Sequence, residues 1–66
     1  MDIFINGIER NLTSNLTLEI LLNKLDCANK KIAVEVNGEI IPRSHVKNRL
    51  IVDGDKIEII NAVGGG

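Results

Sequence analysis

The first twelve residues contain two short apolar segments, with one interruption between them that has the composition of a tight turn. Ile3 and Ile5 share one face of a short strand over residues 2–6, because successive side chains of a strand point to opposite faces. Asn6-Gly7 ends this strand, and the chain resumes as a second strand at residues 8–12. Asn-Gly is the preferred pair for a two-residue type I′ turn, which needs positive φ at both positions. The pattern therefore predicts that the first two strands form an antiparallel hairpin.

The spacing of apolar residues then changes to that of a helix. Thr17 is placed to accept hydrogen bonds as the N-cap, and Glu19 lies in the first turn, where the helix dipole favours an acidic side chain. Leucines recur at the i, i+3, i+4 and i+7 positions that line one helix face, namely Leu18, Leu21, Leu22 and Leu25. The spacing predicts an amphipathic helix of about two and a half turns that ends near Asp26.

Three further strands are predicted after the helix. Residues 32–36 are a predicted third strand, and a second Asn-Gly pair turns the chain into residues 39–41. Pro42 stops this fourth strand because proline has no amide hydrogen to donate to a ladder. Asp53-Gly54-Asp55 predicts a tight turn before a last strand at residues 56–61. The predicted order is β-β-α-β-β-β, an α+β domain with one helix packed across one face of a single mixed sheet.

One helix covers one face of such a sheet, so the other face stays partly wet. Alternation places Phe4, Ile41 and Ile60 on this second face. Adjacent apolar side chains on an open sheet face indicate a surface that docks onto another protein. Ordinary packing at the sheet edge is the alternative interpretation of these three residues.

Composition and charge exclude several function classes. Of the 66 residues, eight are Lys or Arg and nine are Asp or Glu, which gives a formal net charge of −1. No basic field is present to attract a nucleic acid or an anionic membrane. No apolar run approaches the roughly 20 residues of a membrane span, and no signal peptide is recognised at the start. With Cys27 as the single cysteine, we expect a reducing compartment: the cytoplasm, or the plastid stroma if the chain is plastid-encoded.

Few side chains are available for catalysis or metal binding. Nucleophilic catalysis needs Cys27 or a serine beside a base, and His45 is the single histidine. We interpret Cys27 as a small residue at the helix exit and His45 as a solvated loop residue. Asp53 and Asp55 have the spacing of a turn, and a calcium loop needs several more oxygen ligands. The sequence therefore predicts neither a catalytic residue nor a metal site.

The end of the sequence loses both alternation and side-chain bulk. Its last three residues, Gly64, Gly65 and Gly66, are half of the six glycines. We expect residues 1–61 to form the domain and residues 62–66 to leave it as a flexible tail. A frayed terminus is one interpretation of this tail. The other is chemical, because a tail without Cβ atoms can enter a narrow channel and present its terminal carboxylate to the catalytic groups of another protein.

Several motifs together resemble a known family. Residues 36–43 read Val-Asn-Gly-Glu-Ile-Ile-Pro-Arg, residues 53–55 read Asp-Gly-Asp, and Leu-Thr-Leu-Glu stands at residues 16–19. Combined with the closing Val-Gly-Gly-Gly, they resemble the ThiS family of sulfur carriers in thiamin biosynthesis over essentially the whole chain. This resemblance implies a ubiquitin-like β-grasp fold.

The same resemblance implies a carrier that is itself a substrate and not an enzyme. A ThiF-type enzyme would activate the carboxylate of Gly66 as an acyl-adenylate, using ATP and magnesium that this chain does not bind itself. Sulfur from a cysteine desulfurase would replace the AMP to give a thiocarboxylate, which the thiazole synthase ThiG would use to build the thiazole ring. Val63, Gly64 and Gly65 would form the slender tail that enters both partners' sites. We expect the carrier alone to be a monomer.

Three alternatives stay open. MoaD, the small subunit of molybdopterin synthase, resembles this fold and uses the same terminal thiocarboxylate for a different cofactor, but it is usually longer and richer in aromatic residues. A ubiquitin-like protein modifier would join Gly66 to a target lysine by an isopeptide bond. The third alternative is a β-grasp interaction module with an idle tail.

Overall fold

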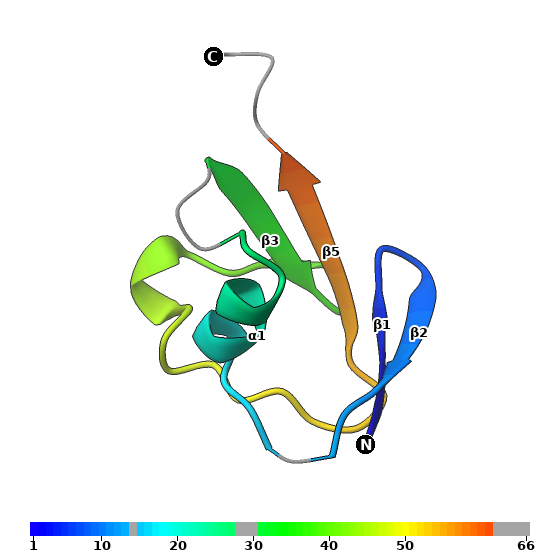
Figure 1. Cartoon of the computed structure of the whole chain (residues 1–66). Helices are drawn as coiled ribbons and strands as arrows, with labels where there is room; N and C mark the ends of the chain where they lie inside the picture. The colour runs from blue at the N-terminus through cyan, green and yellow to red at the C-terminus, as the bar shows by residue number, and fades with distance from the viewer. Residues whose placement is uncertain (14, 28–30, 62–66) are drawn as a thin grey trace.

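The fold places one helix against one face of a five-stranded sheet, as the computed structural model shows for residues 1–13, 15–27 and 31–61 (Figure 1). The strand order across the sheet is β2-β1-β5-β3-β4. The elements along the chain are β1 (Asp2–Ile5), β2 (Ile8–Asn11), α1 (Leu18–Lys24), β3 (Ile32–Val36), β4 (Glu39–Ile40), the 3-10 turn η1 (Arg43–His45) and β5 (Lys56–Asn61). The predicted α+β fold with the order β-β-α-β-β-β is therefore confirmed.

Both Asn-Gly pairs form the hairpin turns that their composition predicts. Asn6 and Gly7 have φ values of 50° and 82°, and Asn37 and Gly38 have φ values of 54° and 85°. These left-handed conformations are those that a type I′ turn requires. The first turn pairs β1 with β2, and the second pairs β3 with β4, in both cases antiparallel.

The last strand, β5, lies at the centre of the sheet. It pairs in parallel with β1 on one side and antiparallel with β3 on the other. The β3 ladder runs the full length of β3, from Ile32 opposite Asn61 to Val36 opposite Ile57. In Figure 1 the start of β3 and the end of β5 extend together beyond the turn of the β1–β2 hairpin. The first residues of β5 are therefore held on both sides, whereas its last two residues pair with β3 alone.

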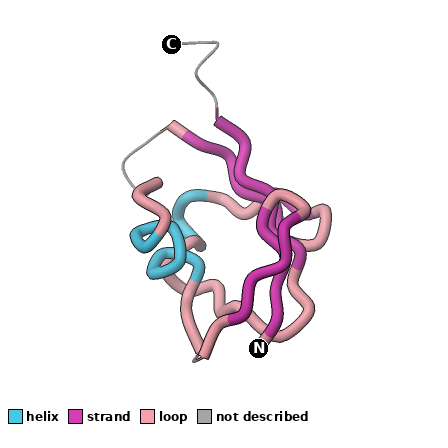
Figure 2. The backbone as a smooth tube through the Cα atoms, turned by 45° about the vertical axis from the view of Figure 1, so that its right-hand side comes forward, coloured by secondary structure: helices cyan, strands magenta, loops and turns pink. Residues whose placement is uncertain are grey.

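The helix follows the predicted leucine face and forms a separate layer beside the sheet (Figure 2). Leu18, Leu21 and Leu22 are buried, and the Thr17 hydroxyl accepts a hydrogen bond from the Ile20 amide at 3.3 Å, as an N-cap does. The helix ends at Lys24, slightly before the predicted end, because the chain reverses where Asp26 adopts a φ of 60°.

A core of aliphatic side chains fills the space between helix and sheet. It consists of Ile3, Ile5, Leu16, Leu18, Leu21, Leu22, Val34, Val36, Ile51 and Ile57. The segment that follows η1 closes this core and also holds the start of the helix. The Leu18 amide donates to the Arg49 carbonyl at 2.8 Å, and the Ile51 amide donates to the Leu16 carbonyl at 2.9 Å. No helix in the described part of the chain is long and apolar enough to cross a bilayer.

Candidate functional site

The predicted functional residues at the end of the chain, Val63, Gly64, Gly65 and Gly66, lie outside the described residues. The structure instead defines how the strand that leads into them is held. β5 ends at Asn61, one residue before the predicted tail begins. The site is therefore built from β5, its two neighbours and the sheet face beside it.

Asn6 extends the hold of the first hairpin on β5 beyond the regular ladder. Its backbone amide donates to the Ile57 carbonyl at 2.9 Å. Its side-chain oxygen accepts from the Ile59 amide at 2.8 Å. The chain turns away from β5 at this position, so the side chain supplies the acceptor that the next residue of β1 would otherwise provide.

Asn37, at the second hairpin turn, holds the start of β5. Its backbone amide donates to the Lys56 carbonyl at 2.8 Å, and its side-chain oxygen accepts from the Lys56 amide at 3.0 Å. Its side-chain nitrogen donates to Asp55 Oδ1 at 3.0 Å. Asn6 therefore holds the middle of β5, and Asn37 holds its first residue.

The Asp53-Gly54-Asp55 segment is a turn, as predicted, and both carboxylates bind protein groups. Asp53 Oδ1 accepts from the Asp2 amide at 2.6 Å, and Asp55 Oδ2 accepts from the Val52 amide at 2.9 Å. Within the three described stretches, no three His, Cys, Asp or Glu side chains gather as a metal site requires. These aspartates therefore position β5.

Cys27 and His45 were the two residues considered for nucleophilic chemistry, and they lie in different surroundings. Cys27 packs partly buried against the core just after the helix, and its thiol donates to the Leu25 carbonyl at 3.4 Å. His45 is exposed in η1. The described residues thus give neither side chain the hydrogen-bonded partner that an activated nucleophile has.

The open face of the sheet carries two of the three residues of the predicted docking patch. Phe4 lies opposite Lys56, and Ile60 lies opposite Ala33 and is 48% exposed. Both point away from the helix, because their strand neighbours Ile3, Ile5 and Ile57 belong to the core.

The placement of Ile41 on that open face is wrong. Ile41 packs against the core on the helix side, and its amide donates to the carbonyl of buried Val34 at 2.8 Å. Ile40 takes the open position instead, opposite Glu35 and 65% exposed. A strand has a side-chain period of two, so an assignment shifted by one residue exchanges the two faces.

Charged side chains separate the three exposed apolar positions of this sheet face, Phe4, Ile40 and Ile60, which we call the open apolar surface. Glu35 and Glu58 lie directly opposite one another across β3 and β5, and Glu9 lies opposite Phe4 across β1 and β2. Like charges that face each other across two strands destabilise a sheet. Lys56, opposite Phe4, adds a basic side chain, so this face carries charges of both signs between its apolar positions.

Comparison with known proteins agrees with this geometry over nearly the whole sequence. The sequence model of the ThiS family matches residues 3–66. A thiazole synthase of Paramagnetospirillum magneticum is 46% identical over 66 residues, which are 100% of this chain and only 20% of that relative's length. The sulfur carrier protein ThiS of Escherichia coli is 29% identical over 66 residues, covering 100% of both chains.

A solved structure shows the same arrangement of elements. The crystal structure of the thiamine biosynthesis protein ThiS from Geobacter metallireducens superposes with a TM-score of 0.85 and 30% sequence identity. The match covers 100% of each chain. The β-grasp arrangement of helix and sheet in this chain is therefore the one seen in that protein.

Proposed function

Because this chain belongs to the ThiS family, we propose that it carries sulfur for the thiazole ring of thiamin on its last residue, Gly66. The observation that carries this proposal is the family match, which extends through residue 66 and so includes the closing glycines. The sulfur carrier of Escherichia coli matches along its entire length. The proposed function is that of a carrier, with catalysis supplied by its partners.

The proposed chemistry takes place at a carboxylate. An adenylating enzyme of the ThiF type joins the Gly66 carboxylate to AMP from ATP, with magnesium, and pyrophosphate leaves. A persulfide charged by a cysteine desulfurase then attacks the acyl carbon and displaces AMP, which forms an acyl disulfide. A thiol reductant cleaves the S–S bond of this intermediate, is itself oxidised to a disulfide, and releases the thiocarboxylate. Glycine suits this position because it has no side chain to obstruct a narrow active site.

We propose that this thiocarboxylate passes its sulfur to a thiazole synthase. The similarity to part of a thiazole synthase supports this partner, since a segment like this chain lies within the same polypeptide there. The open apolar surface of Phe4, Ile40 and Ile60 is proposed as the docking face for the partners. The location proposed for this transfer is the cytoplasm or a plastid stroma.

The test is a mass measurement on the intact chain. Incubation with a ThiF-type enzyme, ATP, magnesium and a sulfur donor is expected to exchange one oxygen for one sulfur, located by fragmentation on Gly66. An unchanged mass with an enzyme that is active on its own carrier contradicts the proposal. If Gly66 instead becomes joined to a lysine of another protein, the chain acts as a protein modifier and the sulfur-carrier proposal is wrong.

A further inference from the structure

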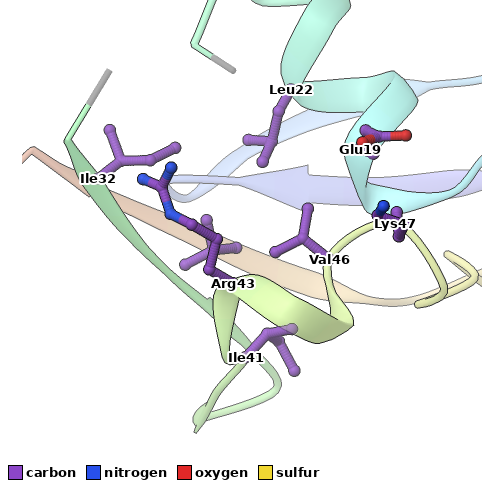
Figure 3. A pocket seen from close by; sticks show the side chains of 8 residues that line it. Glu19, Leu22, Ile32, Ile41, Arg43, Val46 and Lys47 are labelled. Atoms are coloured by element: carbon purple, nitrogen blue, oxygen red, sulfur yellow. The ribbon is translucent and has the colours of Figure 1, made fainter. Parts of the chain in front are cut away.

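A groove of about 250 Å³ opens on the helix side of the sheet, between α1, β3 and η1 (Figure 3). It lies on the other side of the sheet from the open apolar surface. Its lining combines aliphatic side chains with charged residues that are exposed to solvent. The aliphatic residues are Leu22, Ile32, Val34, Ile41 and Val46, and the charged residues are Glu19, Arg43 and Lys47.

The groove lies next to the point where the chain leaves the sheet. Ile32, which lines it, is the cross-strand partner of Asn61, the last residue of β5. Paired residues of antiparallel strands have Cα atoms about 4.5 to 5.5 Å apart. The five residues that follow Asn61 extend to about 17 Å. The end of the chain is therefore long enough to turn around the end of β3 and enter the groove.

Arg43 gives the groove a positive charge on the side toward Ile32. Figure 3 shows its side chain extended across the groove between Ile32 and Val46. Among the described residues, Arg43 forms neither an ion pair nor a side-chain hydrogen bond. The ion pair seen there joins Arg49 to Asp55. The guanidinium is thus an exposed cation beside an apolar lining, with donors available for a carboxylate.

The chemical character of the chain end complements this groove. Residues 62–66 contain one branched aliphatic side chain, Val63, and close with the carboxylate of Gly66. We propose that the groove binds this end of the same chain, with Val63 on the aliphatic lining and the Gly66 carboxylate paired with Arg43. In this state the terminus is shielded, and a partner must displace it before reaction.

The placement of the two surfaces gives this binding a role. A partner that docks on Phe4, Ile40 and Ile60 approaches the face opposite the groove, so it can bind while the tail is still held. Tail release then becomes a separate step after docking. The binding itself requires only an unmodified carboxylate, so it goes beyond the proposed sulfur chemistry and can be tested without it.

Nuclear magnetic resonance of the labelled full chain tests the proposal. Cross-peaks are expected between the Val63 methyl groups and those of Leu22, Ile32 or Val46. Arg43→Gln is expected to lower the ratio of bound to free tail by about two- to fivefold, the range of a solvent-exposed ion pair. Arg10→Gln is the matched control, because it removes the same charge from β2 at the distant edge of the sheet.

Two outcomes overturn this inference. The absence of Val63 cross-peaks to the groove excludes binding of the tail. Equal cross-peaks in Arg43→Gln and in the unsubstituted chain exclude the pairing with Arg43. A failure to exchange oxygen for sulfur on Gly66 is a separate result, since these spectra are recorded on the chain before any enzyme is added.

Discussion

The side chain of Asn37 donates a hydrogen bond to the buried carboxylate of Asp55 at 3.0 Å, across 18 residues of sequence. This contact ties the second hairpin turn to the residue that precedes β5. Asp55 is 3% exposed, accepts from the Val52 amide at 2.9 Å and lies 3.6 Å from the Arg49 guanidinium. One carboxylate therefore binds three groups around the start of β5.

Removal of this carboxylate is expected to destabilise the whole fold. Asp55→Ala leaves the Asn37 amide, the Val52 amide and the Arg49 charge without their acceptor, at a cost of about 2 to 3 kcal/mol in the free energy of unfolding. Urea denaturation followed by circular dichroism measures the loss. Asp53→Ala is the matched control, because its carboxylate accepts one exposed hydrogen bond, and about 1 kcal/mol or less is expected. Equal losses in the two variants contradict the central role of Asp55.

The contact between Asn6 and Ile59 is expected to control local opening near the tail. Asn6→Gly keeps the positive φ but removes the side-chain acceptor, so the Ile59 amide should exchange with solvent about fivefold faster, which corresponds to about 1 kcal/mol. Asn6→Asp keeps an oxygen in place and should retain most of the protection. Hydrogen exchange measured by nuclear magnetic resonance distinguishes the two. If the Ile59 amide of Asn6→Gly exchanges at the rate of the unsubstituted chain, the side-chain acceptor does not protect this amide and the prediction is wrong.

The open apolar surface is expected to matter for partner binding and little for folding. Ile40→Ser and Ile60→Ser should each raise the KM for the carrier in adenylation about tenfold, as expected when about 1.4 kcal/mol of interface energy is lost. Ile8→Ser is the matched control, because Ile8 is 61% exposed on edge strand β2 opposite core residue Ile5. If Ile8→Ser raises the KM as much as Ile40→Ser and Ile60→Ser do, the effect comes from a general loss of exposed apolar area, and the docking role of the open apolar surface is wrong.

The position of the carboxylate is expected to be as important as its presence. One alanine appended after Gly66 should abolish the mass change caused by the adenylating enzyme and sulfur donor, because it moves the carboxylate and adds a Cβ atom at the end of the tail. Thermal unfolding should stay at the unsubstituted midpoint, since the core is formed by residues 3–57. Sulfur transfer by the extended chain, with no trimming detected by mass, refutes the mechanism.

The regular elements of the fold were readable from local patterns. The Asn-Gly pairs specify left-handed turns that few other residues tolerate, and both hairpins form where these pairs occur. The leucine spacing specifies the buried face of α1, and the Thr17 cap specifies its start. These features depend on neighbours a few residues apart, which a sequence displays directly.

Other features depend on contacts that no local pattern records. The hydrogen bond between Asn6 and Ile59 joins residues 53 positions apart, and the burial of Asp55 follows from the segments that surround it. Ile40 and Ile41 are identical in type, so only the register of β4 on β3 shows which of them faces the helix. The run of three glycines at residues 64–66 is visible in the sequence, but glycine composition alone does not specify a reaction. The chemistry proposed for Gly66 rests on membership of the ThiS family.

The central position of β5 has a mechanical consequence. Ladder hydrogen bonds run across a strand, so traction applied to Asn61 along the strand axis loads the bonds to β1 and β3 together in shear. An edge strand peeled from its side would instead lose its bonds one after another. In the proposed function an enzyme draws the chain end into its channel, and this shear geometry lets the domain resist unfolding under that force.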